Sequence, residues 1–251
     1  MNDIIRVNEV FLSFEGEGPY AGRKTLFVRL AGCPLSCYWC DTDYALSFDA
    51  GTVYDVFNFA EELVEKIKAT NPYKVNFTGG EPLAQFSALQ ILLPIIKSRQ
   101  PTRIYLESSC YNSYYVKELL KYIDIMKVEF KLKSSKASRN IDKLQEQELK
   151  SLEYTLERPV NYYIKIVITG DEGEFEELTD LYKRIAEITA KDTIELSLIK
   201  RFRGLYLQPE YNSITNNRLS KDLLLKYYDQ ASMYFNDVFV LPQIHKVLNV
   251  E

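Results

Sequence analysis

The sequence predicts an α/β fold with mostly parallel strands and crossover helices, arranged as an open sheet or as a barrel, complete or partial. Short runs rich in Val, Ile, Leu, Phe and Tyr alternate along the chain with longer stretches in which apolar residues recur at helical spacing. The chain has 251 residues, of which 46% are hydrophobic, so it can bury a substantial core. Both architectures place functional residues at the carboxyl ends of their strands.

The first strand, loop and helix follow from simple periodicity. Residues 24–30 alternate and are rich in Leu, Phe and Val, which predicts a strand leading into a loop of cysteines. Residues 56–67 repeat apolar side chains at helical spacing with Glu and Lys on the opposite face, which predicts an amphipathic helix. Residues 73–77 predict a short strand, followed by the Thr-Gly-Gly-Glu-Pro loop at 78–82 and a helical stretch through residue 95.

The alternation continues toward the carboxyl terminus. Further strands are predicted at 103–107, 125–130, 162–168, 194–198 and 238–241. Further helices are predicted near 115–122, 175–188 and 221–234. Residues 136–157 are rich in Lys, Glu, Gln and Ser without a strong apolar stripe, so we expect a charged, helical insertion at the periphery. No repeat or linker divides the sequence, which predicts one domain over residues 1–251.

The composition disfavours several classes of partner. The formal net charge of −4 gives no electrostatic footprint for DNA or RNA, which favours a small-molecule partner. Three of the four cysteines stand in one loop, which implies a reducing compartment because oxidation would destroy thiolate ligands. The amino terminus carries charges where a signal peptide has an apolar block, and no apolar run reaches membrane-spanning length. We therefore expect a cytoplasmic protein without membrane contact.

The most informative motif is the stretch Cys-Pro-Leu-Ser-Cys-Tyr-Trp-Cys, which contains Cys33, Cys37 and Cys40. Three thiolates at this spacing can bind three corners of an iron–sulfur cube and leave the fourth iron open for chemistry. Zinc is the alternative at this point, and it would need a fourth ligand such as Cys110, His245 or a distant carboxylate. Paired two-cysteine knuckles, the usual zinc pattern, do not occur in the sequence.

A second motif narrows the choice. The cysteine loop follows one predicted strand, and Gly79, Gly80, Glu81 and Pro82 follow the next, so the chain resembles the radical S-adenosylmethionine (SAM) enzymes. The resemblance implies a partial (open) β/α barrel of the radical SAM type, with a [4Fe-4S] cluster whose open iron binds the methionyl end of SAM. Glycines let backbone groups approach that end, and Glu81 offers an acceptor for its ammonium group. The alternative is a strand-to-helix turn in which the charge of Glu81 favours the helix dipole.

Further stretches resemble the 7-carboxy-7-deazaguanine synthases. They are Phe-Glu-Gly-Glu-Gly at 14–18, the approach to the cysteines at 27–33, Asp-Thr at 41–42, Leu-Gln-Pro at 207–209 and the closing segment at 243–249. The resemblance implies conversion of 6-carboxy-5,6,7,8-tetrahydropterin to 7-carboxy-7-deazaguanine with loss of ammonia. This carbon–nitrogen lyase reaction belongs to queuosine- and archaeosine-type deazapurine biosynthesis, a tRNA modification pathway. It also implies Mg²⁺, a homodimer and a one-electron donor such as a flavodoxin or ferredoxin.

The resemblance implies a role for each matching residue. Substrate contacts fall to Phe14, Glu15, Gly16, Arg29, Thr78 and the terminal residue Glu251. SAM contacts fall to Tyr38, Trp39, Gly79, Gly80, Glu81, Ser134, Ser135, Lys136 and Gln208. The cluster ligands are Cys33, Cys37 and Cys40, and Thr42 is expected to help bind Mg²⁺. No catalytic residue is assigned beyond the cluster and SAM.

Some positions depart from the family pattern or allow a simpler interpretation. Glu15 replaces the usual Gln, and an ionised Glu only accepts hydrogen bonds whereas Gln also donates. Ser135 replaces a Pro. Arg29 suits a bidentate carboxylate contact, although a surface ion pair on a strand is the alternative. The single histidine, His245, is expected to order the final segment, and Cys110 is expected to fill a small apolar space.

Two rival functions remain at this point. A radical SAM activase that installs a glycyl radical on a partner protein would share the cysteine loop and the Gly-Gly-Glu motif. It would have no use for the 14–18 segment or for the Gln-x-His-Lys ending. A non-enzymatic zinc or electron-transfer protein is the rival from another class, and cleavage of SAM on reduction would exclude it.

Overall fold

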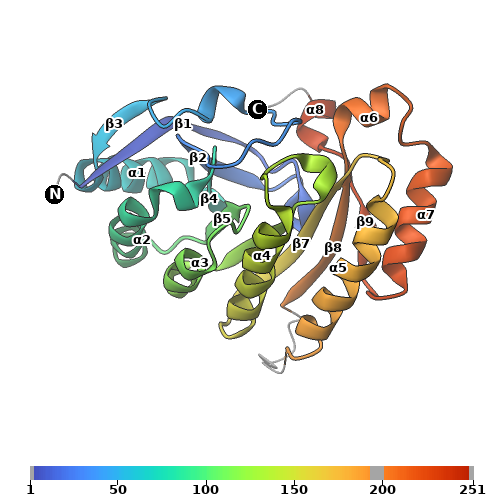
Figure 1. The fold of residues 1–251 in the computed structure, drawn as a ribbon. Coiled ribbons are helices and arrows are strands. Elements are labelled where there is room, and N and C mark those ends of the chain that lie inside the picture. Colours follow the sequence, from blue (N-terminus) through green and yellow to red (C-terminus); the bar gives the residue numbers. More distant parts are fainter. Residues whose placement is uncertain (1–2, 193–200, 249–251) are drawn as a thin grey trace.

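The centre of the molecule is a curved sheet, seen in Figure 1 with helices along its outer side. The structure is a computed structural model that describes residues 3–192 and 201–248. Within these residues, nine strands form one sheet in the order β3-β1-β2-β4-β5-β6-β7-β8-β9. The strands are β1 (Ile4–Phe14), β2 (Lys24–Leu30), β3 (Thr52–Asp55), β4 (Lys74–Gly79), β5 (Ile104–Ser108), β6 (Ile125–Phe130), β7 (Asn161–Ile168), β8 (Phe202–Pro209) and β9 (Val238–Val240).

The sheet is mostly parallel and does not close. Every neighbouring pair from β2 to β9 is parallel, whereas β1 pairs antiparallel with both β2 and β3. Strands β3 and β9 are the two edges, and they do not pair with each other in the described residues. The predicted open β/α barrel with mostly parallel strands is therefore confirmed.

Helices cover the outer face of the parallel strands (Figure 1). They are α1 (Val56–Thr70), α2 (Phe86–Arg99), α3 (Ser113–Leu119), α4 (Ile141–Leu156), α5 (Glu174–Thr189) and α7 (Lys221–Ser232). The short helices α6 (Tyr211–Thr215) and α8 (Ile244–Leu248) lie at the top of the molecule in Figure 1. The start of α1 shows why the sequence folds in this way. Asp55 accepts hydrogen bonds from the backbone N–H groups of Phe57 and Asn58, and the apolar face of the helix then meets the sheet.

Strand alternation separates apolar from charged side chains. On β4, Val75 and Phe77 join the hydrophobic core under the helices, while Lys74 and Asn76 lie on the other face. The same division occurs on β6, where Met126, Val128 and Phe130 belong to the core and Lys127 and Glu129 do not. The helix-covered face is therefore apolar, and the concave face collects polar groups from several strands.

Sequence patterns predicted some strands of the sheet but not others. Predicted strands at 24–30 and 125–130 coincide with β2 and β6, but β1, β3 and β8 were not predicted. Strand β1 alternates between partly exposed and more buried positions, and β8 contains Arg203 and Gly204, so neither shows a continuous apolar run. The predicted strand at 194–198 lies outside the described residues.

The expectation of a peripheral insertion at residues 136–157 is wrong. Helix α4 within this segment is the crossover between β6 and β7, and Leu149 and Leu152 join the hydrophobic core. The apolar stripe was obscured because polar residues occupy much of the buried face, including Gln145, Glu148 and Thr155. Because of these buried polar side chains, the sequence of a core helix has the composition of a solvent-exposed helix.

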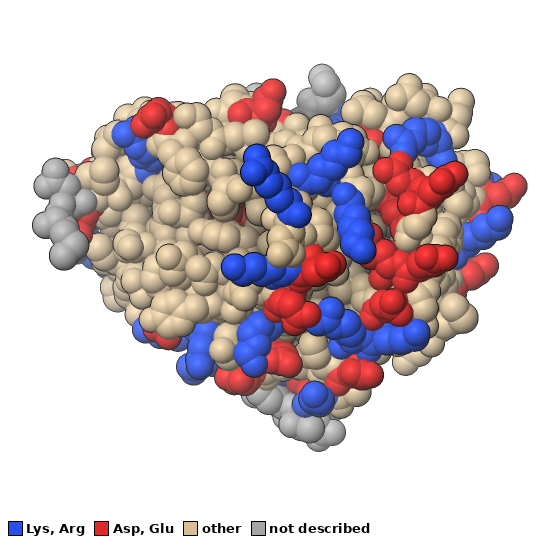
Figure 2. Space-filling view, viewed as in Figure 1, with Lys and Arg blue, Asp and Glu red and all other residues tan. Residues whose placement is uncertain are grey.

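The surface agrees with the charge balance of the chain. Figure 2 shows Lys and Arg side chains beside Asp and Glu side chains over α4 and α5, rather than a face of one sign. None of the helices in the described ranges combines the length and the apolar character that crossing a membrane requires.

Candidate active site

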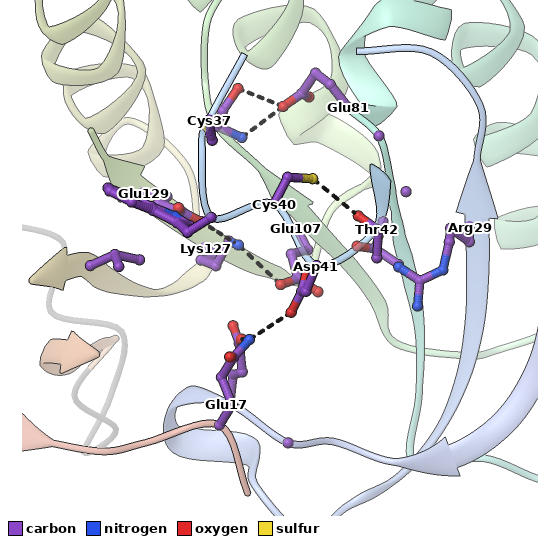
Figure 3. Close-up of a pocket in the computed structure, with 18 of the residues that line it drawn as sticks. Glu17, Arg29, Cys37, Cys40, Asp41, Thr42, Glu81, Glu107, Lys127 and Glu129 are labelled. Atoms are coloured by element: carbon purple, nitrogen blue, oxygen red, sulfur yellow. Dashed lines mark hydrogen bonds and ion pairs between the residues drawn. The ribbon is translucent and has the colours of Figure 1, made fainter. Parts of the chain in front are cut away.

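A cavity of about 420 Å³ opens on the concave face of the sheet. Its lining comes from the end of β1, from the cysteine loop between β2 and β3, from the inner faces of β4 to β7, and from the carboxyl-terminal segment. Figure 3 shows Cys37, Cys40, Glu107, Lys127 and Glu129 around this space. One cavity therefore brings together the cysteines and the charged strand residues.

The cysteine loop is held in place by the turn that follows β6. Ser36 donates its backbone N–H to the carbonyl oxygen of Ala137 at 2.9 Å, and Tyr38 donates to that of Ser135 at 3.2 Å. The thiols of Cys33, Cys37 and Cys40 are free, and all three residues line the cavity. Backbone bonds to a neighbouring element thus give the irregular loop a defined shape.

Burial favours the protonated form of two of these thiols. It raises the pKa of Cys33 to about 12, and it also raises the pKa of Cys37. The N–H of Leu35 already points at the Cys33 sulfur at 3.4 Å, which suits a thiolate. Without a metal centre the Cys33 and Cys37 sulfurs are protonated near neutral pH, so a bound cation is what would stabilise their thiolate form.

Cys110 is separate from the three cysteines of the loop. Among the residues that the structure describes, no three His, Cys, Asp or Glu side chains lie close enough together to hold one metal ion. An iron–sulfur cluster does not require such a group, because each sulfur binds a different iron. Cys110 does not line the cavity; it is fully buried and its sulfur faces the carbonyl oxygens of Ser108 and Lys127. The expectation that Cys110 fills space in the core is confirmed.

The two motif glycines permit close contact between neighbouring loops. Gly79 has a φ of 140°, and an added Cβ would lie 2.1 Å from the carbonyl oxygen of Leu30. An added Cβ on Gly80 would lie 2.6 Å from the carbonyl oxygen of Gly32 and 2.7 Å from that of Ala45. The glycines therefore allow the end of β4 to pack directly against the start of the cysteine loop.

The carboxylate of Glu81 caps and clamps this region. Its Oε1 accepts from the Leu83 N–H at 2.9 Å and the Ser108 hydroxyl at 2.7 Å. Its Oε2 accepts from the N–H and hydroxyl of Ser109 at 2.8 and 2.6 Å. Each oxygen already has two donors. The bond from the Leu83 N–H places the Glu81 carboxylate at the start of the short helix after β4, as a strand-to-helix turn would. A contact between Glu81 and the ammonium of SAM stays a prediction and would require one of these donors to turn away.

Charged side chains on the concave face form one connected set, which we call the inner charge network. Its members are Glu15, Glu17, Lys74, Asn76, Glu107, Lys127, Glu129, Lys131 and Lys165. Four carboxylates and four ammonium groups balance one another, with Asn76 as the neutral bridge. Such balance is what allows so many charges to be buried at once.

The links of this network run from strand to strand. The Asn76 Nδ2 donates to Glu107 at 2.8 Å, and the Lys127 ammonium lies 3.0 Å from Glu107 and 2.6 Å from Glu129. Glu129 also contacts Lys131, and it lies 3.8 Å from Lys165. Neighbouring parallel strands place these residues at similar heights, which brings side chains far apart in sequence into contact.

The network sets the charge of its members. Burial alone would raise the pKa of Glu107, but the ammonium groups of Lys127 and Lys165 outweigh it and lower the pKa to about 2. Burial opposes the charge of Glu129 as well, and Lys127 and Lys131 hold its pKa well below the usual range. These carboxylates are therefore ionised at neutral pH and act as acceptors only.

Arg29 lies at the cavity wall beside the cysteine loop. Its Nε lies 2.6 Å from Glu9, and its guanidinium carbon is 5.5 Å from the ring centre of Phe11 and 5.9 Å from that of Tyr44. The ion pair on a strand that was the alternative is therefore present, but the side chain also faces the cavity. Thr42 lines the same wall, with its hydroxyl oxygen 3.7 Å from the Cys40 sulfur.

The segment after β1 meets the carboxyl-terminal segment above the cavity. Ile244 donates its N–H to the carbonyl oxygen of Gly16 at 3.0 Å, and a Cβ on Gly16 would lie 2.3 Å from Nδ1 of His245. Gln243 donates to Glu17 at 3.1 Å and to Asp41 at 2.8 Å. These contacts agree with the expectation that His245 orders the final segment.

The structure brings most, but not all, of the predicted site residues to the cavity. Those that line it are Phe14, Glu15, Gly16, Arg29, Cys33, Cys37, Trp39, Cys40, Thr42, Thr78, Gly79, Gly80, Glu81 and Gln208. Tyr38, Ser134, Ser135 and Lys136 are not among the lining residues and lie at or behind the cysteine loop, so their contacts with SAM stay predictions. Glu251 lies outside the described residues.

Apart from Glu15, the members of the inner charge network were not predicted as site residues. A signal was available at 127–131, where Lys, Glu and Lys alternate with Val and Phe along the predicted strand at 125–130 and its end. Charges at every second position of a central strand indicate that its second face lines a polar cavity.

The fold and the cysteine loop define an iron–sulfur protein of the radical SAM class. Residues 14–150 match the family described as "4Fe-4S single cluster domain", which agrees with the three free thiols at the cavity wall. The fold is similar to the crystal structure of QueE from Escherichia coli, with a TM-score of 0.54 and 18% identity over 94% of this chain and 92% of that one.

Comparison with curated proteins identifies the family. The chain is 30% identical to the 7-carboxy-7-deazaguanine synthase of Archaeoglobus fulgidus over 96% of this chain and 97% of the relative. It is 28% identical to that of Methanocaldococcus jannaschii over 97% and 99%, and 49% identical to that of Hyperthermus butylicus over 39% and 40%. The chain belongs to the 7-carboxy-7-deazaguanine synthase family.

Proposed function

We propose that this chain converts 6-carboxy-5,6,7,8-tetrahydropterin to 7-carboxy-7-deazaguanine with loss of ammonia. The observation that carries this proposal is a single cavity that joins three free cysteines to a wall of ionised carboxylates and lysines. The substrate has a carboxylate at one end and a guanidine-like edge at the other. A cavity with both cations and acceptors suits such a molecule.

The cysteine wall is proposed to hold the cofactors. Cys33, Cys37 and Cys40 would bind a [4Fe-4S] cluster, which together with SAM supplies radical chemistry when bound. Trp39, Gly79 and Gly80 lie on the same wall and are proposed SAM contacts, together with Gln208 across the cavity. A cavity on the concave face would limit the access of water to reactive species once its ligands are bound, which is the contribution expected of the protein.

The substrate is proposed to lie between this wall and the inner charge network. Arg29 would bind the substrate carboxylate through its two terminal guanidinium nitrogens. Among the described residues, only its Nε has a hydrogen-bond partner, which is Glu9. Phe14, Glu15, Gly16 and Thr78 would contact the pterin ring, and Glu251 would complete the site. Thr42 is proposed to bind Mg²⁺ near the substrate carboxylate.

Several wider properties belong to the same proposal. We expect a cytoplasmic homodimer that receives single electrons from a flavodoxin or ferredoxin and serves deazapurine nucleoside synthesis. Light scattering of the reconstituted protein tests the homodimer. Removal of Mg²⁺ with a chelator, followed by its return, tests the metal requirement.

The decisive experiment is anaerobic reconstitution followed by incubation with carboxytetrahydropterin, SAM, Mg²⁺ and a reductant. The expected result is 7-carboxy-7-deazaguanine by mass spectrometry, with SAM required for turnover. An intact cluster that cleaves SAM without forming this product would reject the substrate. A glycyl-radical activase would instead modify a protein, and a zinc protein would bind zinc and leave SAM uncleaved.

A further inference from the structure

Lys74 lies fully buried beneath the floor of the cavity. Its side chain is 0% exposed, and its ammonium group pairs with Glu15, which is 4% exposed. The ammonium also lies 4.2 Å from the ring centre of Tyr105 and about 6 Å from those of Tyr20 and Phe27. Among the described residues, Glu15 is its one hydrogen-bonding partner. A desolvated ammonium is thus matched to a single carboxylate.

Every polar contact of the Glu15 carboxylate comes from a donor. Oε2 accepts from the ammonium of Lys74 and from Nδ2 of Asn76 at 3.4 Å, and Oε1 accepts from the Glu17 N–H at 3.3 Å. A carboxylate offers about four acceptor positions, so one remains on Oε1. Because Glu15 lines the cavity, a ligand can use that position.

A Gln at position 15 would behave differently in these surroundings. A Gln amide has one acceptor oxygen and one NH₂ group, so its NH₂ would face another donor, either the Glu17 N–H or an N–H of the ligand. The donors around Glu15 favour a carboxylate, and Lys74 provides the cation that favours its charged form in a buried position. Glu15 and the buried Lys74 therefore form one structural unit.

We propose that Lys74 is a positioning residue that keeps Glu15 ionised and acceptor-only, so that Glu15 selects ligands with an N–H donor edge. The proposal rests on the proposed function, in which the 2-amino and ring N–H groups of the pterin form such an edge. Lys74 does not line the cavity, so it acts through Glu15 and not by touching the substrate.

Lys74 is the main group that opposes protonation of Glu15. The pKa of Glu15 lies above its ordinary value, because burial raises it and the carboxylates of Glu107 and Glu17 add to the rise, while Lys74 lowers it. Burial also lowers the pKa of Lys74 itself. Tyr105 and Tyr163 also face this carboxylate, and His245 packs against the adjoining Gly16. Without Lys74, burial and the neighbouring carboxylates would favour the protonated acid, opposed by the donors Asn76 and the Glu17 N–H. A protonated Glu15 would donate where the ligand also donates.

The test measures binding of 7-carboxy-7-deazaguanine, and of its analogue without the 2-amino group, to the reconstituted enzyme by calorimetry. The wild type should prefer the 2-amino compound by about tenfold to a hundredfold, and Glu15→Gln should lose most of that preference. In measurements at pH 8 and pH 6, Lys74→Met should lose more of the preference at the lower pH than the wild type does, because Glu15 is protonated more readily without its cation. Met fills the aromatic surroundings of Lys74 without a charge.

Two further variants separate this role from a merely structural one. In Glu15→Gln/Lys74→Met the pH dependence should disappear, because the group that titrates is gone. The control Lys97→Met also removes a lysine from an ion pair, here with Asp124 outside the cavity. It should keep the wild-type preference for the 2-amino compound at both pH values. His245 is unchanged in every variant, so each variant is compared with the wild type at the same pH.

Several outcomes would overturn the inference. It fails if Glu15→Gln keeps the full preference for the 2-amino compound. It also fails if Lys74→Met weakens the binding of both ligands equally at both pH values. The same holds if Lys74→Met changes ligand preference as much in the Glu15→Gln variant as in the wild type. If Lys74→Met does not fold, Glu15→Gln alone decides the matter. An active wild type with unselective binding rejects this inference only, whereas an inactive wild type that does not bind the product rejects the proposed function.

Discussion

The cysteine loop and the inner charge network are two walls of one cavity, and they are built in opposite ways. The loop is irregular backbone, with its three ligands close together in sequence and held by bonds to the turn after β6. The network is regular strand, with members drawn from β4, β5, β6, β7 and the segment after β1. The comparison teaches that a local motif can supply the cysteine wall, whereas the network wall requires assembly of the whole sheet.

The largest expected effect is on the loop wall. Cys37→Ala should abolish cluster assembly and product formation, because three sulfurs are needed to hold the cluster with one open iron. Iron and sulfide content and the visible absorption spectrum measure the result. The matched control is Cys110→Gly, which removes the buried thiol at a φ of 58° that suits glycine. The control should keep its cluster, and loss of iron from Cys110→Gly would give that cysteine a ligand role.

Substitutions in the inner charge network should lower the free energy of unfolding. Lys127→Met leaves the buried carboxylates of Glu107 and Glu129 without their shared cation, which should cost about 3–5 kcal/mol. Denaturant unfolding of the apoprotein measures this free energy. Lys150→Met breaks an exposed pair with Glu153 on α4 and should cost less than about 1 kcal/mol. Equal losses in the two variants would mean that the buried network contributes no more than a surface pair.

A smaller effect is expected where the carboxyl-terminal segment joins the two walls. Gly16→Ala would place a Cβ against His245, displace the final segment and lower kcat/KM by up to about a hundredfold. Cluster content should not change, because the cysteine loop is not touched. Gly16→Ala/His245→Ala should recover part of the activity by removing the clash. Failure of this rescue would show that His245 contributes more than its packing.

The smallest expected effect is a shift in acid sensitivity. Glu107 has a folded pKa of about 2 against an ordinary value of 4.5, so its contribution to stability is full above about pH 4.5 and is lost as the pH falls through 2. Lys127→Met should raise this pKa and move the acid unfolding midpoint upward by about one pH unit. Circular dichroism against pH measures the midpoint. An unchanged midpoint would mean that another group dominates acid unfolding.

Local patterns were sufficient for the loop wall and for much of the scaffold. The run at 24–30 and the cysteines after it predicted a strand and a metal loop, and both are present. Helix α1 was predicted because its apolar face repeats at the helical period. These features depend on residues close in sequence, so periodicity and spacing are enough to reveal them.

The remaining features depend on partners far away in sequence. Helix α4 buries Glu148 beside the backbone N–H of Lys131, and this contact turns a charged stretch into part of the core. Strand β8 is recognisable only from its parallel pairing with β7 and β9. In both cases tertiary contacts outweigh local composition.

By itself, the sequence determined the cysteine wall of this protein, since its three cysteines and the two glycines after β4 stand in two short motifs. The tertiary structure decided the network wall. Only the pairing of neighbouring strands brings Glu15, Lys74, Glu107 and Lys127 into one buried, balanced network. The physical reason is that a buried charge is stable only beside its partner, and the partner is chosen by strand order and not by position along the chain.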